Sequence, residues 1–268
     1  MDLSKVKLVV TDMDGTLLNS KSQVSDRFFD LYQDLKEHNI HFVAASGRQY
    51  HSIVDKLEPI KNDITIIAEN GAFVARNGRE LSKINLPDER VHQLIPVLRT
   101  IDNIYFTLCG KKSAYIETHD DKFLAVLKEY YSEYTFVDDL TNVVEDDFFK
   151  IAAYHFENSE KYIYPGVKHF ENDMQVKVSG EHWVGISQPN ANKGYALQLI
   201  QDKMGIGKEE TIVFGDYNND LEMLALAHYS YAMENAHPNV KNTANFHTKS
   251  NDEQGVEIVL EQLLKSIR

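Results

Sequence analysis

Short apolar runs alternate with stretches of helical periodicity in the first quarter of the chain. The runs Val6–Val10, His41–Ala45 and Ile64–Ile67 are typical of buried strands. Apolar residues at helical spacing predict a helix after Ser25, which is a suitable N-cap, and a second helix is expected over Gln49–Leu57. This alternation of strand and helix predicts a parallel sheet with helical crossovers.

The pattern changes from about residue 86. Strand-like stretches now cluster, with helical pieces between them, of which Lys122–Tyr131 is the clearest. The stretches are Ile104–Leu108, Ala114–Glu117, Phe149–Tyr154, Gln175–Ser179 and His182–Ile186. We therefore expect a mixed α/β unit with a sheet of its own.

The first pattern returns after Pro189. Asn192 can cap a helix that ends at Gly205, and Thr211–Phe214 is typical of a short buried strand. Further expected elements are a helix from Leu221, strands near Tyr229–Met233 and Asn245–His247, and a helix over Val256–Ile267. These elements continue the strand–helix order of the first quarter.

The predicted fold class is α/β, with a doubly wound, mostly parallel, Rossmann-like core and an inserted α/β cap domain. The core would be discontinuous and would consist of residues 1–85 and 187–268, with the cap over 86–186. The chain between Ser46 and Lys193 is far longer than one helix and one strand require. The insertion must therefore lie between these two residues.

The composition is that of an ordinary globular protein, but the charge is strongly negative. Of 268 residues 43% are hydrophobic, and 28 Lys and Arg against 41 Asp and Glu give a net charge of −13. This charge argues against general binding of nucleic acid or of anionic membranes.

Cys109, the only cysteine, excludes an intrachain disulfide. No apolar run reaches the roughly 18 residues of a membrane span, and the first residues lack a signal peptide's apolar segment. We expect a cytoplasmic protein without an obligate protein partner.

Two carboxylates, Asp12 and Asp14, follow the first predicted strand. Ligands of open α/β sheets bind at the carboxyl ends of the strands, and Gly15 lets the backbone turn there. One carboxylate can attack phosphorus, and the other can protonate the leaving group and then deprotonate water. Acidic groups this close need a cation between them, and Mg²⁺ takes oxygen ligands. The alternative interpretation is an Asp-rich turn with capping duties.

Two further candidate sites are the segment Ser46–Arg48, at the end of a predicted strand, and Lys193, at the start of a predicted helix. Ser46 and Gly47 can form an anion site, although an N-capping serine is the simpler interpretation. Arg48 fits a surface or inter-domain position better than a ligand. Lys193 lies in the first turn of a helix, where a cation opposes the helix dipole. This placement indicates either a functional lysine or a solvated one.

The segment Gly215–Asp220 follows another predicted strand. Asp216 is placed to be a third carboxylate ligand of the metal, and Asp220 could orient Lys193 or a metal-bound water. Asn219 could donate a hydrogen bond to phosphate. A turn followed by an N-cap is the alternative, although three polar side chains exceed what a cap requires.

Four strings together resemble the haloacid dehalogenase-like phosphatases. They are TDMDGTLL from Thr11, ASGR from Ala45, the Asn-Lys-Gly from Asn192 and GDYNND from Gly215. The strings ENGAF, AMENA and SNDEQGV are similar to the Cof-type, class IIB branch, and LVVTDMDGTLL, FVAASGRQY and CGKKSAYI resemble its bacterial sugar phosphatases. The resemblance covers essentially the whole chain. It implies the fold, Mg²⁺ dependence and hydrolysis of a small-molecule phosphate ester, and more weakly a sugar phosphate.

The resemblance also implies roles for residues of this chain. Asp12 would be the nucleophile and a metal ligand, and Asp14 the general acid and base, with its backbone carbonyl on Mg²⁺. Asp216 would be the remaining metal ligand, and Asp220 a supporting residue. The expected substrate-binding residues are Asp12, Met13, Asp14, Ser46, Gly47, Lys193 and Asn219, of which Lys193 would also be catalytic. Tyr217 departs from the small residues common at its position.

The inserted unit would be a lid that excludes water and selects the leaving group. His182 and Trp183 precede the return to the core and could face the substrate, while packing within the cap is the competing interpretation of Trp183. Two other functions stay open. A sugar phosphomutase would return the phosphoryl group to another hydroxyl, and a phospho-accepting signalling module would keep it on the aspartate.

Overall fold

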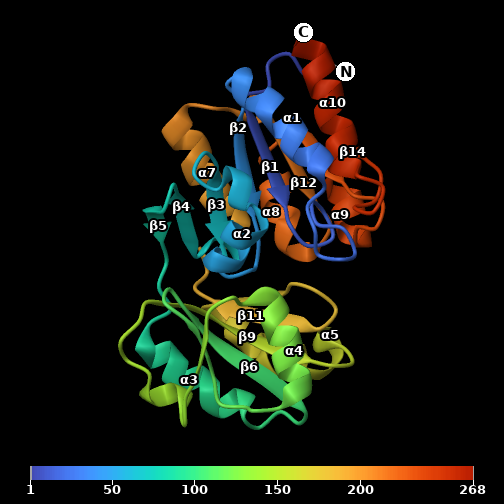
Figure 1. Ribbon diagram of the computed structural model, residues 1–268. Helices are drawn as coiled ribbons and strands as arrows, with labels where there is room; N and C mark the ends of the chain where they lie inside the picture. Colours follow the sequence, from blue (N-terminus) through green and yellow to red (C-terminus); the bar gives the residue numbers. More distant parts are fainter. Residues whose placement is uncertain (1, 268) are drawn as a thin grey trace.

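The computed structural model describes residues 2–267, and the larger of the two sheets in this part of the chain forms the core (Figure 1). Neighbouring strands are parallel except for the last two, which are antiparallel. The strand order is β14 (Phe246–His247), β13 (Tyr229–Ala232), β12 (Thr211–Gly215), β1 (Leu8–Asp12), β2 (His41–Ala45), β3 (Thr65–Ala68), β4 (Phe73–Arg76) and β5 (Arg79–Lys83).

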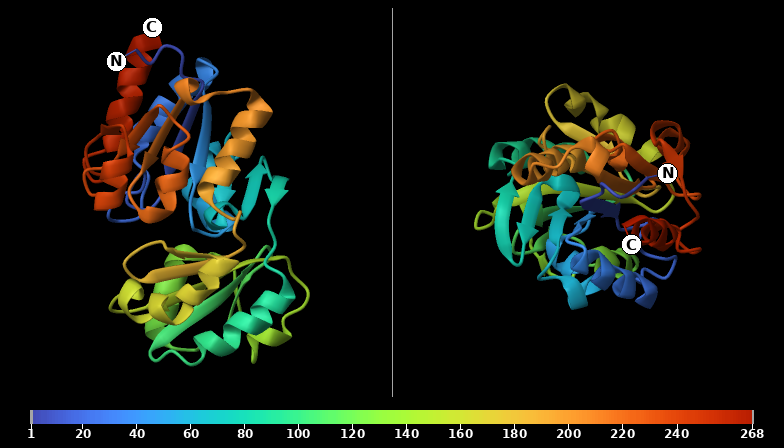
Figure 2. Two further views of the ribbon diagram at one scale, coloured as in Figure 1. Left: turned by 180° about the vertical axis from the view of Figure 1, so that it is seen from behind. Right: turned by 90° about the horizontal axis from the view of Figure 1, so that it is seen from above.

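Helices cover both faces of the core sheet, as a doubly wound fold requires (Figure 2). On one face lie α1 (Asp26–Glu37) and α10 (Gly255–Ile267). On the other lie α7 (Lys193–Met204) and α8 (Leu221–Leu224). Further core helices are α2 (Tyr50–Lys56) and α9 (Pro238–Thr243). The predicted α/β, doubly wound class is confirmed.

The ends of two core helices follow the local signals in the sequence. Ser25 Oγ accepts a hydrogen bond from the N–H of Phe28 at 3.1 Å and so caps α1. The apolar positions of α1, among them Phe28 and Leu35, are buried against the sheet. α7 ends at Gly205, whose φ of +66° favours glycine.

A second sheet with its own helices forms the cap. Its strand order is β10 (Gln175–Val178), β11 (Trp183–Ser187), β9 (Phe148–His155), β6 (Ile104–Gly110), β7 (Ala114–Ile116) and β8 (Tyr134–Phe136). The cap helices are α3 (Asp88–Leu98), α4 (Asp121–Tyr130), α5 (Ser159–Tyr162) and α6 (Tyr164–Val167). Leu94 and Ile95 of α3 and Val167 of α6 share one apolar cluster, whereas Phe123 and Leu127 of α4 belong to another.

Two segments connect the core and the cap. The chain leaves the core after β5, enters α3, and returns from β11 to α7 (Figure 2). The carboxyl ends of β1, β2 and β12 point toward the cap (Figure 1). Polar side chains that follow these strands therefore face the space between core and cap. Short 3₁₀ helices occupy Glu58–Ile60, Glu69–Gly71, Leu140–Asn142, Lys168–Asn172, Lys208–Glu210 and Asn218–Asp220.

The hairpin of β4 and β5 is not among the predicted elements, although β4 carries a buried apolar run. β5 lies at the sheet edge and its side chains are mostly exposed, so it lacks the apolar run that marks a buried strand. The turn does carry a recognisable signal, because Asn77 and Gly78 both have positive φ, at 49° and 68°. The short strand β8 was missed for the same reason, since its residues are partly exposed.

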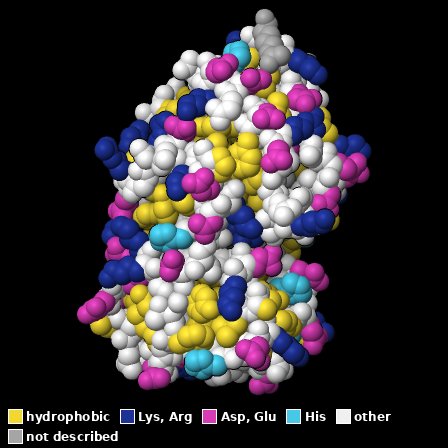
Figure 3. All heavy atoms as spheres, viewed as in Figure 1, with side chains coloured by type: hydrophobic (Ala, Val, Ile, Leu, Met, Phe, Trp, Pro, Cys, Tyr) yellow, Lys and Arg dark blue, Asp and Glu magenta, His cyan; other side chains and the backbone are white. Residues whose placement is uncertain are grey.

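Charged side chains of both signs are intermixed on the face shown in Figure 3, over core and cap alike. No helix formed by residues 2–267 combines the length and the apolar character that crossing a bilayer demands.

Candidate active site

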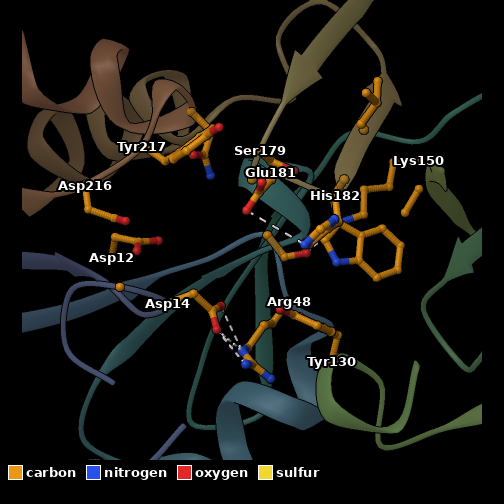
Figure 4. Close-up of a pocket in the computed structure, with 18 of the residues that line it drawn as sticks. Asp12, Asp14, Arg48, Tyr130, Lys150, Ser179, Glu181, His182, Asp216 and Tyr217 are labelled. Atoms are coloured by element: carbon orange, nitrogen blue, oxygen red, sulfur yellow. Dashed lines mark hydrogen bonds and ion pairs between the residues drawn. The ribbon is translucent and has the colours of Figure 1, made fainter. Parts of the chain in front are cut away.

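A cavity of about 290 Å³ lies between the carboxyl ends of the core strands and the cap (Figure 4). Both parts of the molecule line it. The core contributes Asp12, Asp14, Gly47, Arg48, Asp216 and Asn219, and the cap contributes Tyr130, Lys150, Glu181, His182 and Trp183. Residues from motifs far apart in the sequence thus meet at one place.

Lys193, the first residue of α7, holds two carboxylates together. Its Nζ donates to Asp12 Oδ1 at 2.5 Å and to Asp220 Oδ1 at 2.7 Å, and all three residues are buried. Burial raises the pKa of Asp12 to about 7, helped by the charges of Asp220 and Asp14 and opposed by Lys193. Burial acts to lower the pKa of Lys193, but the two carboxylates raise it above its ordinary value. The ammonium therefore stays charged.

Asp216 brings a third carboxylate to this place. Oxygens of Asp12, Asp216 and Asp220 lie within 4.8 Å of one another. Asp216 Oδ1 accepts from the Thr16 hydroxyl at 3.2 Å, and a Cβ at Gly15 would lie only 2.3 Å from Asp216 Oδ2. Glycine at position 15, with φ of +73°, is thus required by the turn and by the close approach.

The crowding of these carboxylates fits a divalent cation. Burial raises the pKa of Asp216 well above its ordinary value, and the neighbouring charges of Asp12 and Asp220 add to the effect. The donors are all oxygens, which suits a hard cation. Asp220 already binds Lys193, and its Oδ2 accepts from the backbone N–H groups of residues 216 and 217 at 2.9 and 3.1 Å. Asp12 and Asp216 are therefore the side chains with room for the ion.

Asp14 points away from this cluster and toward Arg48 (Figure 4). Arg48 Nε lies 2.8 Å from Asp14 Oδ2, and Nη2 lies 2.5 Å from Oδ1. Arg48 is 1% exposed, donates to the backbone carbonyl of Glu129 in the cap, and lies 4.6 Å from the centre of the Tyr130 ring. Arg48 therefore lies between core and cap, which is one of the two positions expected from the sequence. The other, a position on the surface, is wrong.

Three predicted phosphate-binding residues gather on the core side. Ser46 Oγ accepts from the N–H of Arg48 at 3.1 Å, and Asn219 Nδ2 donates to Asn70 Oδ1 at 3.0 Å. A Cβ at Gly47 would lie 3.1 Å from the same Asn70 oxygen. The side chain of Met13 is buried in the apolar core. Met13 can therefore reach a ligand only through its backbone.

The cap side of the cavity is aromatic. Trp183 lies edge-on to Tyr154 at 4.8 Å and to Tyr130 at 5.5 Å between ring centres. His182 and Trp183 both line the cavity, so Trp183 packs within the cap and faces the cavity at once. Tyr217 lines the same cavity from the core (Figure 4).

Comparison with known proteins identifies the family. The sequence model for haloacid dehalogenase-like hydrolases matches residues 9–260. The chain belongs to this family. The relative YbjI of Escherichia coli, a 5-amino-6-(5-phospho-D-ribitylamino)uracil phosphatase, is 34% identical to this hydrolase over 263 residues, which are 97% of either chain. The phosphatase YwpJ of Bacillus subtilis is 28% identical and is matched over 97% of this chain and 100% of its own. The family predicted from the four strings is confirmed.

Solved structures share the fold of this hydrolase. SMU.1108c of Streptococcus mutans matches it with a TM-score of 0.91 at 30% identity, over 97% of this chain and 99% of that chain. BT4131, a sugar phosphatase of subclass IIB, matches with a TM-score of 0.81 at 20% identity, over 96% and 98% of the two chains. At 20% identity, the likeness to BT4131 shows a shared fold alone.

Sequence reasoning missed two buried residues beside the site of this hydrolase. Lys150 lies in β9 of the cap, and its Nζ is 2.8 Å from Glu69 Oε2 of the core. Both residues are almost fully buried. The signal available was a single lysine within an otherwise apolar and aromatic stretch, FFKIAAYH. Its partner could not be read from the pattern, because Glu69 lies in a loop of the other sheet.

Proposed function

We propose that this hydrolase cleaves phosphate monoesters of small metabolites, sugar phosphates foremost, through an aspartyl-phosphate on Asp12. The observation that carries the proposal is the meeting of Asp12, Lys193 and Asp216 at the strand ends. Lys193 binds one oxygen of the Asp12 carboxylate, and we assign the other oxygen as the nucleophile. Residues 86–186 are the proposed cap, which shields the site from bulk water.

The reaction takes place in two steps. Asp12 attacks phosphorus and the bond from phosphorus to the ester oxygen breaks. Asp14, turned from Arg48 toward the cavity that it lines and protonated in the substrate complex, gives that oxygen a proton. Asp14, now ionised, then takes a proton from water, whose oxygen attacks the phosphorus of the aspartyl-phosphate. Inorganic phosphate leaves and both carboxyl groups return to their starting states.

The charge of the phosphoryl group is offset from several sides. Lys193 supplies one positive charge, and the Ser46 hydroxyl, the Gly47 N–H and the Asn219 amide are the proposed hydrogen-bond donors. Asp12 and Asp216 would hold Mg²⁺, together with the backbone carbonyl of Asp14. Bound Mg²⁺ would supply the remaining positive charge on the phosphoryl oxygens.

The aromatic wall supports a second substrate class, in which a flat ring is attached to the phosphorylated chain. Trp183 and Tyr130 offer ring faces or edges to such a group. The name of the Escherichia coli relative describes a compound of this kind, a phosphorylated ribityl chain on a uracil. Sugar phosphates remain the first class because the motifs of this chain resemble those of the bacterial sugar phosphatases.

The test is a phosphate-release panel with and without Mg²⁺. It contains sugar phosphates, nucleotides, cofactor phosphates and 5-amino-6-(5-phospho-D-ribitylamino)uracil. We expect Mg²⁺-dependent release of inorganic phosphate, fastest with a sugar or ribityl phosphate. Formation of an isomeric sugar phosphate without free phosphate would indicate a mutase instead. An aspartyl-phosphate stable for minutes would indicate a signalling module.

A further inference from the structure

A lysine of the cap reaches into the phosphate-binding part of the core. Lys150 stands in the middle of β9, is 4% exposed, and lines the cavity. Its Nζ donates to the backbone carbonyl of Gly47 at 2.5 Å and pairs with Glu69 at 2.8 Å. A cation buried this deeply needs both partners, because an unpaired charge is costly away from water. The contact therefore exists only while the cap lies against the core.

The two acceptors belong to loops that are joined by backbone hydrogen bonds. The N–H of Asn70 donates to the carbonyl of Ser46 at 2.9 Å, and the N–H of Glu69 donates to the carbonyl of Arg48 at 3.0 Å. Gly71 packs so closely on the start of α7 that a Cβ there would lie 2.3 Å from the carbonyl oxygen of Asn192. The loop at residues 69–71 thus touches the elements that carry Ser46 and Lys193.

The backbone of this loop is in an unfavourable conformation. Glu69 and Asn70 have φ of +53° and +56°, a region that asparagine tolerates but glutamate seldom adopts. Such outliers persist where the surrounding structure holds them, and they concentrate at functional sites. Here the conformation directs the Glu69 carboxylate at Lys150 and the Asn70 side chain at Asn219.

The contact of Lys150 fixes the direction of one peptide group. In the peptide that joins Gly47 to Arg48, the carbonyl accepts from Lys150 and the N–H donates to Ser46 Oγ at 3.1 Å. Because Oγ accepts this hydrogen bond, the hydroxyl hydrogen of Ser46 is available to another acceptor. A phosphoryl oxygen bound beside Gly47, which lines the cavity, would be such an acceptor.

We propose that Lys150 is a positioning residue of the cap, which orients the Ser46 hydroxyl toward phosphate through the carbonyl of Gly47. Docking of the cap then completes the phosphate site as well as covering it. Glu69 keeps the buried ammonium charged and in place. The inference rests on the phosphatase function proposed above. Direct contact of Lys150 with the leaving group is the competing role, since Lys150 also lines the cavity.

The test removes both charges of the pair. Lys150→Met alone would leave the Glu69 carboxylate buried without its cation, so it is combined with Glu69→Gln. We expect a Tm near the wild-type value, a loss of about tenfold in kcat/KM, and a similar rise in the inhibition constant of inorganic phosphate, as for one hydrogen bond to a charged group. A double variant with wild-type values of both constants would overturn the proposal.

The same double substitution, made in a Ser46→Ala protein, separates a positioning role of Lys150 from its direct contact with the leaving group. In Ser46→Ala, the added double substitution should change the inhibition constant of phosphate by less than about twofold, because coupled residues are not additive. A full further tenfold loss in that background would overturn the route through Ser46. Rescue of the phosphate affinity by Lys150→Arg with Glu69 intact would support it.

The matched control is another ion pair between cap and core. Lys177 Nζ of β10 lies 2.5 Å from Glu222 Oε1 of α8, and neither residue lines the cavity. Lys177→Met combined with Glu222→Gln should leave kcat/KM within about twofold of wild type, as expected of a partly exposed pair. An equal loss in this control would overturn a specific role for Lys150.

Wild-type phosphate release is measured before these variants. Its absence would contradict the function proposed above but would not decide the role of Lys150. Binding of inorganic phosphate, measured by calorimetry on the same proteins, then replaces kcat/KM. We then expect the Lys150→Met, Glu69→Gln variant to bind inorganic phosphate about tenfold more weakly than wild type. The control pair should bind it with wild-type affinity.

Discussion

Lys193 Nζ lies 2.5 Å from Asp12 Oδ1, although the two residues stand 181 positions apart in the chain. The insertion of the cap accounts for most of this separation. Because Lys193 also binds Asp220, its loss would leave acidic groups buried without their cation. We predict that Lys193→Met lowers turnover by at least about 10²–10³ and lowers the free energy of unfolding at pH 8 by about 3–5 kcal/mol. Phosphate release and urea unfolding measure the two effects.

The control for this substitution lies on the same helix. Lys203 is exposed near the end of α7, so Lys203→Met should leave both quantities close to wild type. Turnover of Lys193→Met within tenfold of wild type would contradict the assignment of its ammonium to the phosphoryl site.

Binding of Mg²⁺ should stabilise the protein more at pH 8 than at pH 5.5. Burial raises the pKa of Asp12 to about 7 and that of Asp216 well above its usual range. At low pH these carboxyl groups hold protons that the metal must displace. As the pH rises, the folded protein has to ionise them, which makes the metal-free form less stable, and the cation restores that stability. Mg²⁺ at 100 times its Kd should raise Tm at pH 8 by about 5–10 °C.

Asp216→Asn is the control for the metal site. It keeps the size of the side chain but removes one carboxylate ligand, so the Tm shift at pH 8 should fall by at least about half. The same Mg²⁺ shift at both pH values, or an unchanged shift in Asp216→Asn, would contradict the assigned ligands.

Trp183 should affect the leaving group and not the phosphate. We predict that Trp183→Leu raises KM for sugar phosphates by about tenfold, the size of one lost aromatic contact, and leaves the inhibition constant of inorganic phosphate unchanged. Inorganic phosphate has no leaving group and therefore serves as the control ligand. Trp183 also packs on Tyr154, so Tm is measured alongside. A parallel loss for both ligands would point to a collapsed cap.

His41 should make the fold sensitive to mild acid. Burial lowers the pKa of His41 to about 4, with Arg76 contributing, from an ordinary value of 6.5. Between these values the unfolded chain binds a proton that the folded protein does not, so stability falls as the pH decreases from 6.5 toward 4. The slope is at most about 1.4 kcal/mol per pH unit. The free energy of unfolding of His41→Gln, measured in urea, should lack this loss between pH 6.5 and 4. The variant His38→Gln, which changes an exposed histidine, should keep it.

The core of the fold follows from local signals in the sequence. Each buried strand is a short apolar run that ends in polar residues, and these ends carry Asp12, Ser46 and Asp216. The parallel order then requires the ends to meet at one edge of the sheet. The edge strand β5 carries no such signal because an exposed strand needs no apolar run, whereas its hairpin partner β4 is buried and does have one.

The contacts between core and cap could not be predicted in this way. The pair Lys150–Glu69 and the contact of Arg48 with the cap depend on how two separate sheets dock. Local periodicity carries no information on that docking. Trp183 is a second example of a position that the sequence could not predict. The sequence offers packing within the cap and exposure to the substrate as alternatives, whereas Trp183 packs on Tyr154 and also lines the cavity.

Chemical trapping shows whether Asp12 becomes phosphorylated during the reaction. Asp14→Asn is mixed with an aryl phosphate, whose good leaving group needs no acid, so the second step is the one that slows. Acid quenching and borohydride reduction convert an aspartyl-phosphate to homoserine, which mass spectrometry locates. We expect homoserine at position 12 and none in Asp12→Ala, which should also release no phosphate. Modification at another residue, or phosphate release by Asp12→Ala, would contradict it.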